Sequence, residues 1–478
     1  MSFVDRHRLW SDEDRASAAS MAKAVSESGV EVIRAAFVDQ HGCLRGKTVM
    51  ADDISSLLGS DINMTSTLLL KDTSHKTVFP VWQGDAGFGE GRLTGAGDMV
   101  MVMDPHTFRV LPWAPDHGWV FCDLYYSDGL PLGLSSRGIL RDALARLADR
   151  GYALVTGLEV EFHVFTVLDE CLDLGDAGQP GTPPKLGLIG QGYQYLSDDR
   201  YDELQEVFDA IRLNACELGL PLRSLEIEFG PSQCEATFAP AGAMEHADNM
   251  IRFRALVKQV CRRMGLHATF MCLPRFDAAM ASGWHLHQSL VDRETGQNLF
   301  MPRKKGETIS TLARHWVAGL LAHARESCLF STPTVNGYKR YRPHSLAPDR
   351  IQWGRDNKGA MIRALAGIDD VASRIENRIG EPAANPYLYM ASQVLSGLDG
   401  IERGQEPPKP VDNPYDSEAE RLPNSLLAAL GAFRESAFYR AQLGDEFVDY
   451  LATIKQAEWN RYHAEVSEWE EREYITLF

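Results

Sequence analysis

Alternating hydrophobic and polar positions along the chain predict a mixture of strands and helices. In the first ~130 residues, short runs rich in β-forming residues alternate with turn residues. These runs are VEVIRAAFVD, QHGCLRGKTV, DMVMVMD, FRVLPW and WVFCDLYY. The pattern predicts a small sheet domain with few long helices.

A helical period begins after Ser135 and Ser136, which can cap a helix, and it ends at Gly151. Downstream, strands are predicted at 152–165, 267–274 and 283–291, and helices at 201–219, 243–264, 310–330 and 443–478. The Gly- and Pro-rich stretch 173–187 is predicted to be a surface loop. The shift in pattern places a domain boundary near residue 133, which gives an N-terminal domain, 1–133, and a second domain, 134–478.

Length and composition narrow the class of protein. A chain of 478 residues exceeds the ~250–300 residues at which single cores usually stop growing. With 44% hydrophobic and 24% charged residues, disordered and collagen-like classes are excluded. The net charge of -18 disfavours a nucleic-acid partner. We find no apolar run of the ~20 residues that a membrane span needs and no signal peptide, so a cytoplasmic protein without membrane contact is expected.

The eight cysteines do not form a C-x-x-C motif. Most of them lie in apolar periodic stretches, so we expect reduced core thiols rather than a zinc site or a disulfide framework. They are Cys43, Cys122, Cys171, Cys216, Cys234, Cys261, Cys272 and Cys328.

Two groups of glutamates could bind a divalent cation. Glu159 and Glu161 lie two residues apart in a predicted strand, so both carboxylates face one side, where a hard cation would offset their repulsion. A solvated strand face is the alternative. In LEIEFGPSQCEATF, a Gly-Pro turn could bring Glu228 and Glu235 together. Ordinary exposure on a hairpin explains that pattern equally well.

Histidines and arginines add further candidates. His285 and His287 share one face of a predicted strand, although either one could be purely structural. The segment 336–378 is rich in arginine, which suits phosphate and carboxylate ligands, or salt bridges to the acids elsewhere. Since neither a P-loop nor a G-x-G-x-x-G motif is found, metal and arginine would have to hold any phosphate. This chemistry is typical of kinases and ATP-dependent ligases.

The order of these motifs resembles the glutamine synthetase family of the bacterial type I class and its γ-glutamylamide synthetase relatives. The similarity runs from the R-G-K turn near Arg45 to the WEEREY tail. It implies an α+β fold with a small N-terminal β-grasp-like domain and a large catalytic domain, in which helices flank a curved antiparallel sheet. It also implies a homo-oligomer, a dodecamer of two hexameric rings, with sites between neighbouring subunits.

The resemblance further implies roles for individual residues, with ATP as a substrate and at least two Mg2+ or Mn2+ ions per site. The first metal would be held by Glu161, Glu228 and Glu235, and the second by Glu159, His285 and Glu376. The nucleotide would contact His287, Ser289, Arg363 and Arg374. Glutamate would contact Gly283, Arg340 and Arg378. Arg340 and Arg363 would also act in catalysis with Lys358, which replaces the arginine of many members and loses its bidentate geometry.

Three departures from the family pattern concern the amine. Leu346 replaces the glutamate that attracts and deprotonates ammonium, Met280-Ala281-Ser282-Gly283 replaces N-G-S-G, and Ser232 replaces a glycine. Loss of the acid favours an amine that is already neutral near pH 7, such as aniline, packed against Met280, Trp284 and Leu346.

The expected activity is therefore ATP-dependent ligation of the γ-carboxylate of L-glutamate to an organic amine through γ-glutamyl phosphate. Alkylamines or polyamines, ammonia as in ordinary glutamine synthetase, and a non-catalytic relative are the alternatives. Whether Tyr415, which resembles the family's modifiable tyrosine, is ever modified is left open by the sequence.

Overall fold

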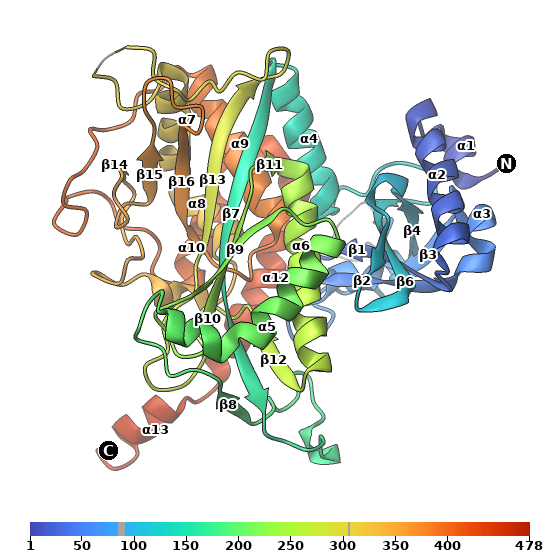
Figure 1. Cartoon of the computed structure of the whole chain (residues 1–478), viewed down its shortest axis with the longest axis horizontal. Helices are drawn as coiled ribbons and strands as arrows, with labels where there is room; N and C mark the ends of the chain where they lie inside the picture. Colours follow the sequence, from blue (N-terminus) through green and yellow to red (C-terminus); the bar gives the residue numbers. More distant parts are fainter. Residues whose placement is uncertain (85–90, 305) are drawn as a thin grey trace.

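An N-terminal sheet, at the right of Figure 1, lies beside a larger body built on a second sheet. The structure is a computed structural model that describes residues 1–84, 91–304 and 306–478. Both sheets are accompanied by helices, so the fold is α+β, as the sequence predicts.

In the N-terminal sheet the strand order is β2-β1-β6-β4-β3, with β5 paired to β6. Strands β1 and β6 are parallel, and the other pairs are antiparallel. The strands are β1 (Val32–Val38), β2 (Leu44–Met50), β3 (Ile62–Thr65), β4 (Asp98–Met103), β5 (Arg109–Leu111) and β6 (Ala114–Tyr125). The helices are α1 (Phe3–His7), α2 (Asp12–Ser28), η1 (Ala51–Asp53), α3 (Ile54–Leu57), η2 (Ser66–Leu70), η4 (Thr94–Ala96) and η5 (Pro105–Thr107).

The large sheet is arranged around one long strand, β7 (Tyr152–Val167). Its order is β14-β15-β16-β13-β7-β10-β9, and β8, β11 and β12 also pair with β7. The other strands are β8 (Leu186–Leu188), β9 (Leu222–Ile227), β10 (Gln233–Phe238), β11 (Ala241–Gly242), β12 (Leu266–Thr269), β13 (Trp284–Asp292), β14 (Trp353–Arg355), β15 (Ile362–Leu365) and β16 (Arg374–Gly380). The pairs that β7 makes are antiparallel.

Helices cover the face of the large sheet that is turned toward the N-terminal sheet (Figure 1). The helices of the larger body are α4 (Ser136–Ala148), η6 (Leu174–Asp176), α5 (Asp198–Glu217), α6 (Ala243–Arg263), α7 (Thr311–Ala322), α8 (Ala324–Ser331), η7 (Gly337–Arg340), α9 (Pro386–Glu402), α10 (Leu426–Glu435), α11 (Ala437–Leu443), α12 (Asp445–Ala464) and α13 (Glu468–Tyr474). Of these, α4 and α6 pack on β7, whereas α13 extends away from the sheet at the lower left of Figure 1. None of the helices in the described ranges is both long and apolar enough to cross a membrane.

Alternation along β7 separates a core face from a polar face. Leu158, Val160 and Phe162 are buried, and the Phe162 ring meets Phe253 of α6 edge to face at 5.8 Å. Glu159 and Glu161 lie between them and therefore point away from the helices. The apolar period of β7 thus fixes the side of the sheet on which the acidic residues gather.

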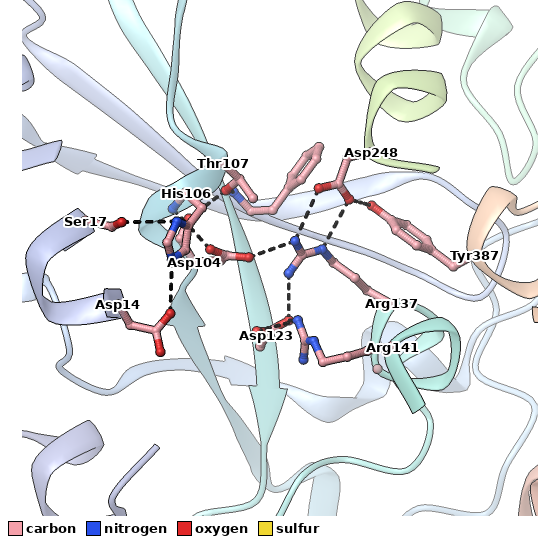
Figure 2. Close-up of polar contacts among 12 residues, drawn as sticks. Asp14, Ser17, Asp104, His106, Thr107, Asp123, Arg137, Arg141, Asp248 and Tyr387 are labelled. Carbon is pink, nitrogen blue, oxygen red and sulfur yellow. Dashed lines mark hydrogen bonds and ion pairs between the residues drawn. The ribbon is translucent and has the colours of Figure 1, made fainter. Parts of the chain in front are cut away.

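A buried ion network joins the two sheets (Figure 2). Arg137 of α4 donates to Asp104 at 2.7 Å, to Asp123 at 3.0 Å and to Asp248 of α6 at 3.2 Å. The Tyr387 hydroxyl of α9 donates to the same Asp248 at 2.6 Å. Burial alone would lower the pKa of Arg137, but the neighbouring carboxylates raise it well above its ordinary value. The guanidinium therefore stays charged and ties the N-terminal sheet to the helices.

The structure corrects several sequence predictions. The predicted helix 310–330 is broken at His323, whose backbone leaves the helical region while its ring bonds Glu326 and Asp399. The predicted strand 267–274 ends at Thr269. The prediction of core thiols is right for five cysteines and wrong for Cys43, Cys171 and Cys216, which are exposed. All eight cysteines are free. The division at residue 133 stays a prediction.

Candidate active site

Strand register brings the acidic and imidazole side chains together on the polar face of the large sheet. Glu235 of β10 lies opposite Glu161 of β7, and His285 of β13 lies opposite Glu159. On the next strand pair, Glu376 of β16 lies opposite His287. Directly opposed residues on neighbouring antiparallel strands have Cβ atoms roughly 5 Å apart, so each pair is close without any loop contact.

Three of the glutamates form one carboxyl cluster, Glu161, Glu228 and Glu235. Glu228 follows the last residue of β9, and both Glu228 and Glu235 are buried. Glu161 accepts hydrogen bonds from the Gly283 amide at 3.0 Å and from the Gln233 side chain at 3.1 Å. The predicted convergence of Glu228 and Glu235 across the turn is found, since both line one cavity with Glu161.

The electrostatics of this cluster fit a divalent cation. Burial raises the pKa of Glu161 and of Glu228, and the Glu228 charge raises that of Glu161 further. Burial and the charges of Glu161 and Glu228 also raise the pKa of Glu235. Carboxylates that repel one another this strongly are stabilised by a cation or by protons.

A second group consists of Glu159, His285 and Glu376. The Nδ1 atom of His285 lies 3.2 Å from Glu159 Oε2 and 3.5 Å from Glu376 Oε1. Burial and the Arg378 charge lower the pKa of His285 to about 4, so its ring is neutral at pH 7 and able to bind a metal. Burial would raise the pKa of Glu376, but His285 and Arg378 hold it below its ordinary value.

The tightest groupings of ligand atoms in the described ranges differ in part from the predicted sets. Glu159, His287 and Glu376 form one grouping, and Glu159, Glu235 and His285 form another, each with ligand atoms within 4.8 Å of one another. His287 has a feature that argues against metal binding. Arg374 Nε lies 3.0 Å from His287 Nδ1, and arginine only donates, so His287 Nε2 must carry the ring proton. That proton is donated to Glu159 at 2.8 Å, so His287 is held as a donor in this arrangement. His285 Nε2 faces Arg340 in a similar way at 3.3 Å, and His285 is favoured as the ligand by its place between Glu159 and Glu376.

Arginines surround the acidic face. Arg340 is buried, donates to the Arg378 carbonyl at 2.8 Å, and lies 3.3 Å from His285 Nε2. Arg378 donates to Glu376 and to the Leu346 carbonyl, and Arg363 donates to Glu376 at 3.1 Å. A Cβ on Gly283 would lie 2.5 Å from Arg340 Nη2, so a larger residue here would displace the Arg340 guanidinium.

Two adjoining cavities run along this face. The larger one, of about 940 Å³, is lined by His287, Ser289 and Arg374 together with apolar residues that include Phe238 and Met301. The smaller one, of about 340 Å³, is lined by the carboxyl cluster and by Arg340, Lys358, Arg363 and Arg378. Glu159, Glu226 and Thr237 line both cavities, so the cavities meet beside the acidic residues.

The smaller cavity also has apolar side chains in its lining. Leu346 is 51% exposed and Met280 is 42% exposed, and both side chains line this cavity. The prediction that Trp284 belongs to this wall is wrong. Trp284 precedes His285 on β13 and therefore points to the opposite face, where it is fully buried against Tyr389.

Three residues of the site were missed in the sequence. Gln233 orients Glu161, and its place in the E-x-x-x-G-Q-x-E pattern could have identified it. Tyr195 and Phe229 also line the smaller cavity. Their rings stack with centroids 4.2 Å apart and planes 8° apart. Tyr195 lies in an irregular segment without hydrophobic periodicity, so the sequence could not have predicted that its ring stacks on Phe229.

This arrangement can neutralise a polyphosphate and activate a carboxylate. Buried carboxyl groups and a neutral imidazole suit divalent cations, and arginines on both sides suit the oxygens of phosphate and carboxylate groups. Charge neutralisation and positioning of this kind account for most of the catalysis of phosphoryl transfer. The smaller cavity also has room for a third reactant, which could contact the apolar side chains of Met280 and Leu346.

Comparisons with known proteins agree with this chemistry. Residues 133–474 match the family described as glutamine synthetase, catalytic domain. The chain is 40% identical to a gamma-glutamylanilide synthase of an Acinetobacter species over 100% of this chain and 99% of that protein. It is 31% identical to a gamma-glutamylethanolamide synthetase of Streptomyces coelicolor over 94% and 93% of the two chains. A solved structure described as apo GmaS without ligand has a TM-score of 0.79 and 29% identity, and the match covers 95% of this chain and 99% of that one.

Proposed function

The chain belongs to the glutamine synthetase family, and we propose that it joins the γ-carboxylate of L-glutamate to an aromatic amine such as aniline. The match across the whole chain supports an ATP-dependent ligase that forms an amide between glutamate and an amine. The choice of an aromatic amine as the substrate is our proposal.

The observation that supports an aromatic amine is the presence of two apolar side chains, Met280 and Leu346, in the lining of the smaller cavity. Leu346 stands where the family has the glutamate that attracts and deprotonates ammonium, and its side chain faces the cavity. A protonated alkylamine would lose water there without gaining a countercharge from this position, whereas a neutral ring would bury apolar surface at about 25 cal/mol per Å². Similarity to a gamma-glutamylanilide synthase supports the same choice.

The proposed reaction has two steps. The γ-phosphoryl group of ATP passes to the γ-carboxylate of glutamate, which gives ADP and γ-glutamyl phosphate. The amine nitrogen then attacks the acyl carbon, phosphate leaves with the bonding electrons, and the nitrogen loses a proton. Two Mg2+ or Mn2+ ions would supply charge neutralisation for the phosphates when bound.

For the cations we propose two sets of residues, which are Glu161, Glu228 and Glu235 for the first and Glu159, His285 and Glu376 for the second. For the nucleotide phosphates we propose His287, Ser289, Arg363 and Arg374. For glutamate we propose Gly283, Arg340 and Arg378. Lys358 lines the smaller cavity, and no hydrogen bond or ion pair of its ammonium is found within the described ranges, so it is free to meet a transferring phosphoryl group.

An alkylamine is the second candidate substrate. The similarity to a gamma-glutamylethanolamide synthetase favours it, since the two chains share 31% identity. Such an amine is mostly protonated at pH 7 and would need a nearby acid, for which Glu226 at the junction of the cavities is the available residue.

A panel of amines tests the proposal. ATP- and glutamate-dependent phosphate release is measured with ammonia, ethylamine, putrescine and aniline, and the amide product is identified by mass spectrometry. We expect the highest kcat/KM for aniline. A higher kcat/KM for ethylamine or putrescine would support the second candidate, and a preference for ammonia would contradict the proposal.

Assembly into two stacked hexameric rings is proposed from the family resemblance. Sedimentation velocity would give the mass of the assembly, and a monomer or dimer at working concentration would contradict it.

A further inference from the structure

The stacked rings of Tyr195 and Phe229 line the smaller cavity, which Met280 and Leu346 also line. Tyr195 is 38% exposed and Phe229 is 39% exposed, although aromatic side chains of this size are usually well covered in a core. Met280 packs beside the same turn, since a Cβ on Gly230 would lie 3.0 Å from the Met280 Cβ. The pair therefore presents ring surface next to the apolar residues that face the amine.

Ser232 connects the segment that carries Tyr195 to the turn that carries Phe229. Its hydroxyl accepts hydrogen bonds from the Ile189 amide at 2.8 Å and the Gly190 amide at 3.3 Å. Its own amide donates to the Gly190 carbonyl at 3.0 Å, and its carbonyl accepts from Val164 of β7 at 3.0 Å. The amide of Ser232 thus bonds the segment that carries Tyr195, and its carbonyl bonds strand β7.

The backbone of Ser232 has a φ of 56°, a conformation that residues other than glycine seldom adopt. A serine in this conformation carries a cost in backbone strain that a glycine would not. What the serine adds is the hydroxyl, which glycine could not offer to the two amides. These two hydrogen bonds hold the start of the segment 189–196 against the turn.

The same segment lies tightly against the turn. A Cβ on Gly192 would lie 2.5 Å from the Pro231 nitrogen, and the Tyr193 amide donates to the Phe229 carbonyl at 2.8 Å. The Leu196 amide donates to Ile227 at 3.3 Å. Contacts on both sides of Tyr195 fix its backbone, and stacking on Phe229 then fixes its ring.

We propose that the Tyr195 and Phe229 pair is the surface on which the ring of the amine packs, and that Ser232 is the positioning residue that holds Tyr195 in place. The inference rests on the proposed function, because an aromatic amine must be the substrate for a ring contact to matter. Aromatic pairs add selectivity through the geometry of their rings as well as through buried area. The pair thus determines the preference for aromatic over aliphatic amines.

The test compares three variants with the wild-type protein. Tyr195→Leu removes the ring and keeps an apolar side chain, and Ser232→Gly removes the hydroxyl while tolerating the positive φ. Tyr193→Ala is the matched control, because Tyr193 belongs to the same segment but is 67% exposed and contacts Arg200 rather than the cavity. KM and kcat are measured for aniline and ethylamine with saturating ATP and glutamate. Hydrogen exchange of the Ile189 and Gly190 amides is followed separately.

Tyr195→Leu and Ser232→Gly should each raise the KM for aniline roughly 2- to 10-fold, with a smaller change for ethylamine. Their kcat at saturating aniline should fall much less. Ser232→Gly should also speed exchange at Ile189 and Gly190, and Tyr193→Ala should change neither selectivity nor exchange. Equal changes for both amines, or an unchanged preference in both variants, would overturn the inference. If the wild type ligates no aromatic amine, the proposed function itself fails, which the wild-type measurements reveal before any variant is compared.

Discussion

Removal of divalent cations should leave the cluster of Glu161, Glu228 and Glu235 partly protonated at neutral pH. Burial and mutual repulsion raise the pKa of all three carboxyl groups above the ordinary value of 4.5. A cation replaces the bound protons, since metal ligands must be deprotonated. Binding of Mg2+ or Mn2+ should therefore release protons into the solution.

The size of the effect follows from the number of shared protons. Three mutually repelling carboxyl groups that each resist ionisation retain about one to two protons at pH 7, and they titrate as a unit. Each displaced proton makes the apparent affinity about tenfold tighter per pH unit, so affinity should rise about 10- to 100-fold between pH 6 and pH 7. His285 adds no further proton in this range, because its pKa is already lowered to about 4.

The same shifts predict how stability depends on pH. A carboxyl group whose pKa is raised in the folded state favours folding while it is protonated, below its unfolded pKa, and this contribution is lost as the pH rises through the folded pKa. The contribution of this cluster to the stability of the cation-free protein should thus fall from about pH 4.5 upward, and cations should restore more of it at higher pH.

Titration calorimetry in buffers of different ionisation enthalpy measures the protons released, and thermal unfolding with and without Mg2+ across pH 5.5 to 8.5 measures the linkage. Glu161→Gln should release fewer protons, whereas Glu217→Gln, at the exposed end of α5, should behave as the wild type. A cation affinity independent of pH, with no proton release, would refute this account of the cluster.

Three further predictions follow from the contacts described above. Leu346→Glu should shift the ratio of kcat/KM from aniline toward ammonium by roughly tenfold or more, because a carboxylate then faces the amine; an unchanged ratio in the amine panel would contradict the role of the apolar wall. Glu161→Ala and Glu376→Ala should each abolish phosphate release without altering the assembly seen by sedimentation, and normal turnover in both would show that the cations bind elsewhere. Arg137→Met should lower the free energy of unfolding in urea by about 3–5 kcal/mol, since it leaves the buried Asp248 and the partly buried Asp104 without their arginine, whereas Arg141→Met, on a half-exposed side chain, should cost about 0–1 kcal/mol. Equal losses in these two variants would contradict the role of Arg137 in tying the N-terminal sheet to α6.

The local pattern of hydrophobic and polar residues was sufficient to predict most of the helices and strands. The long strand around Glu159 and Glu161 and the helices 201–219 and 243–264 have clear periods in the sequence, and the structure confirms them as β7, α5 and α6. The break at His323 was not predicted, because the apolar period continues through it, and the ring contacts with Glu326 and Asp399 that accompany the break join residues that the period does not relate.

The sequence by itself determined the family and the residue types of the site, because ordered motifs such as E-x-E and H-x-H carry their meaning in local spacing. Tertiary structure decided which of these residues meet. Strand register places Glu235 opposite Glu161 and Glu376 opposite His287, although these residues lie far apart along the chain. Trp284 does not line the cavity, because its side chain points to the buried face of the sheet. Tyr195 does line it, because long-range contacts dock its irregular segment against Phe229.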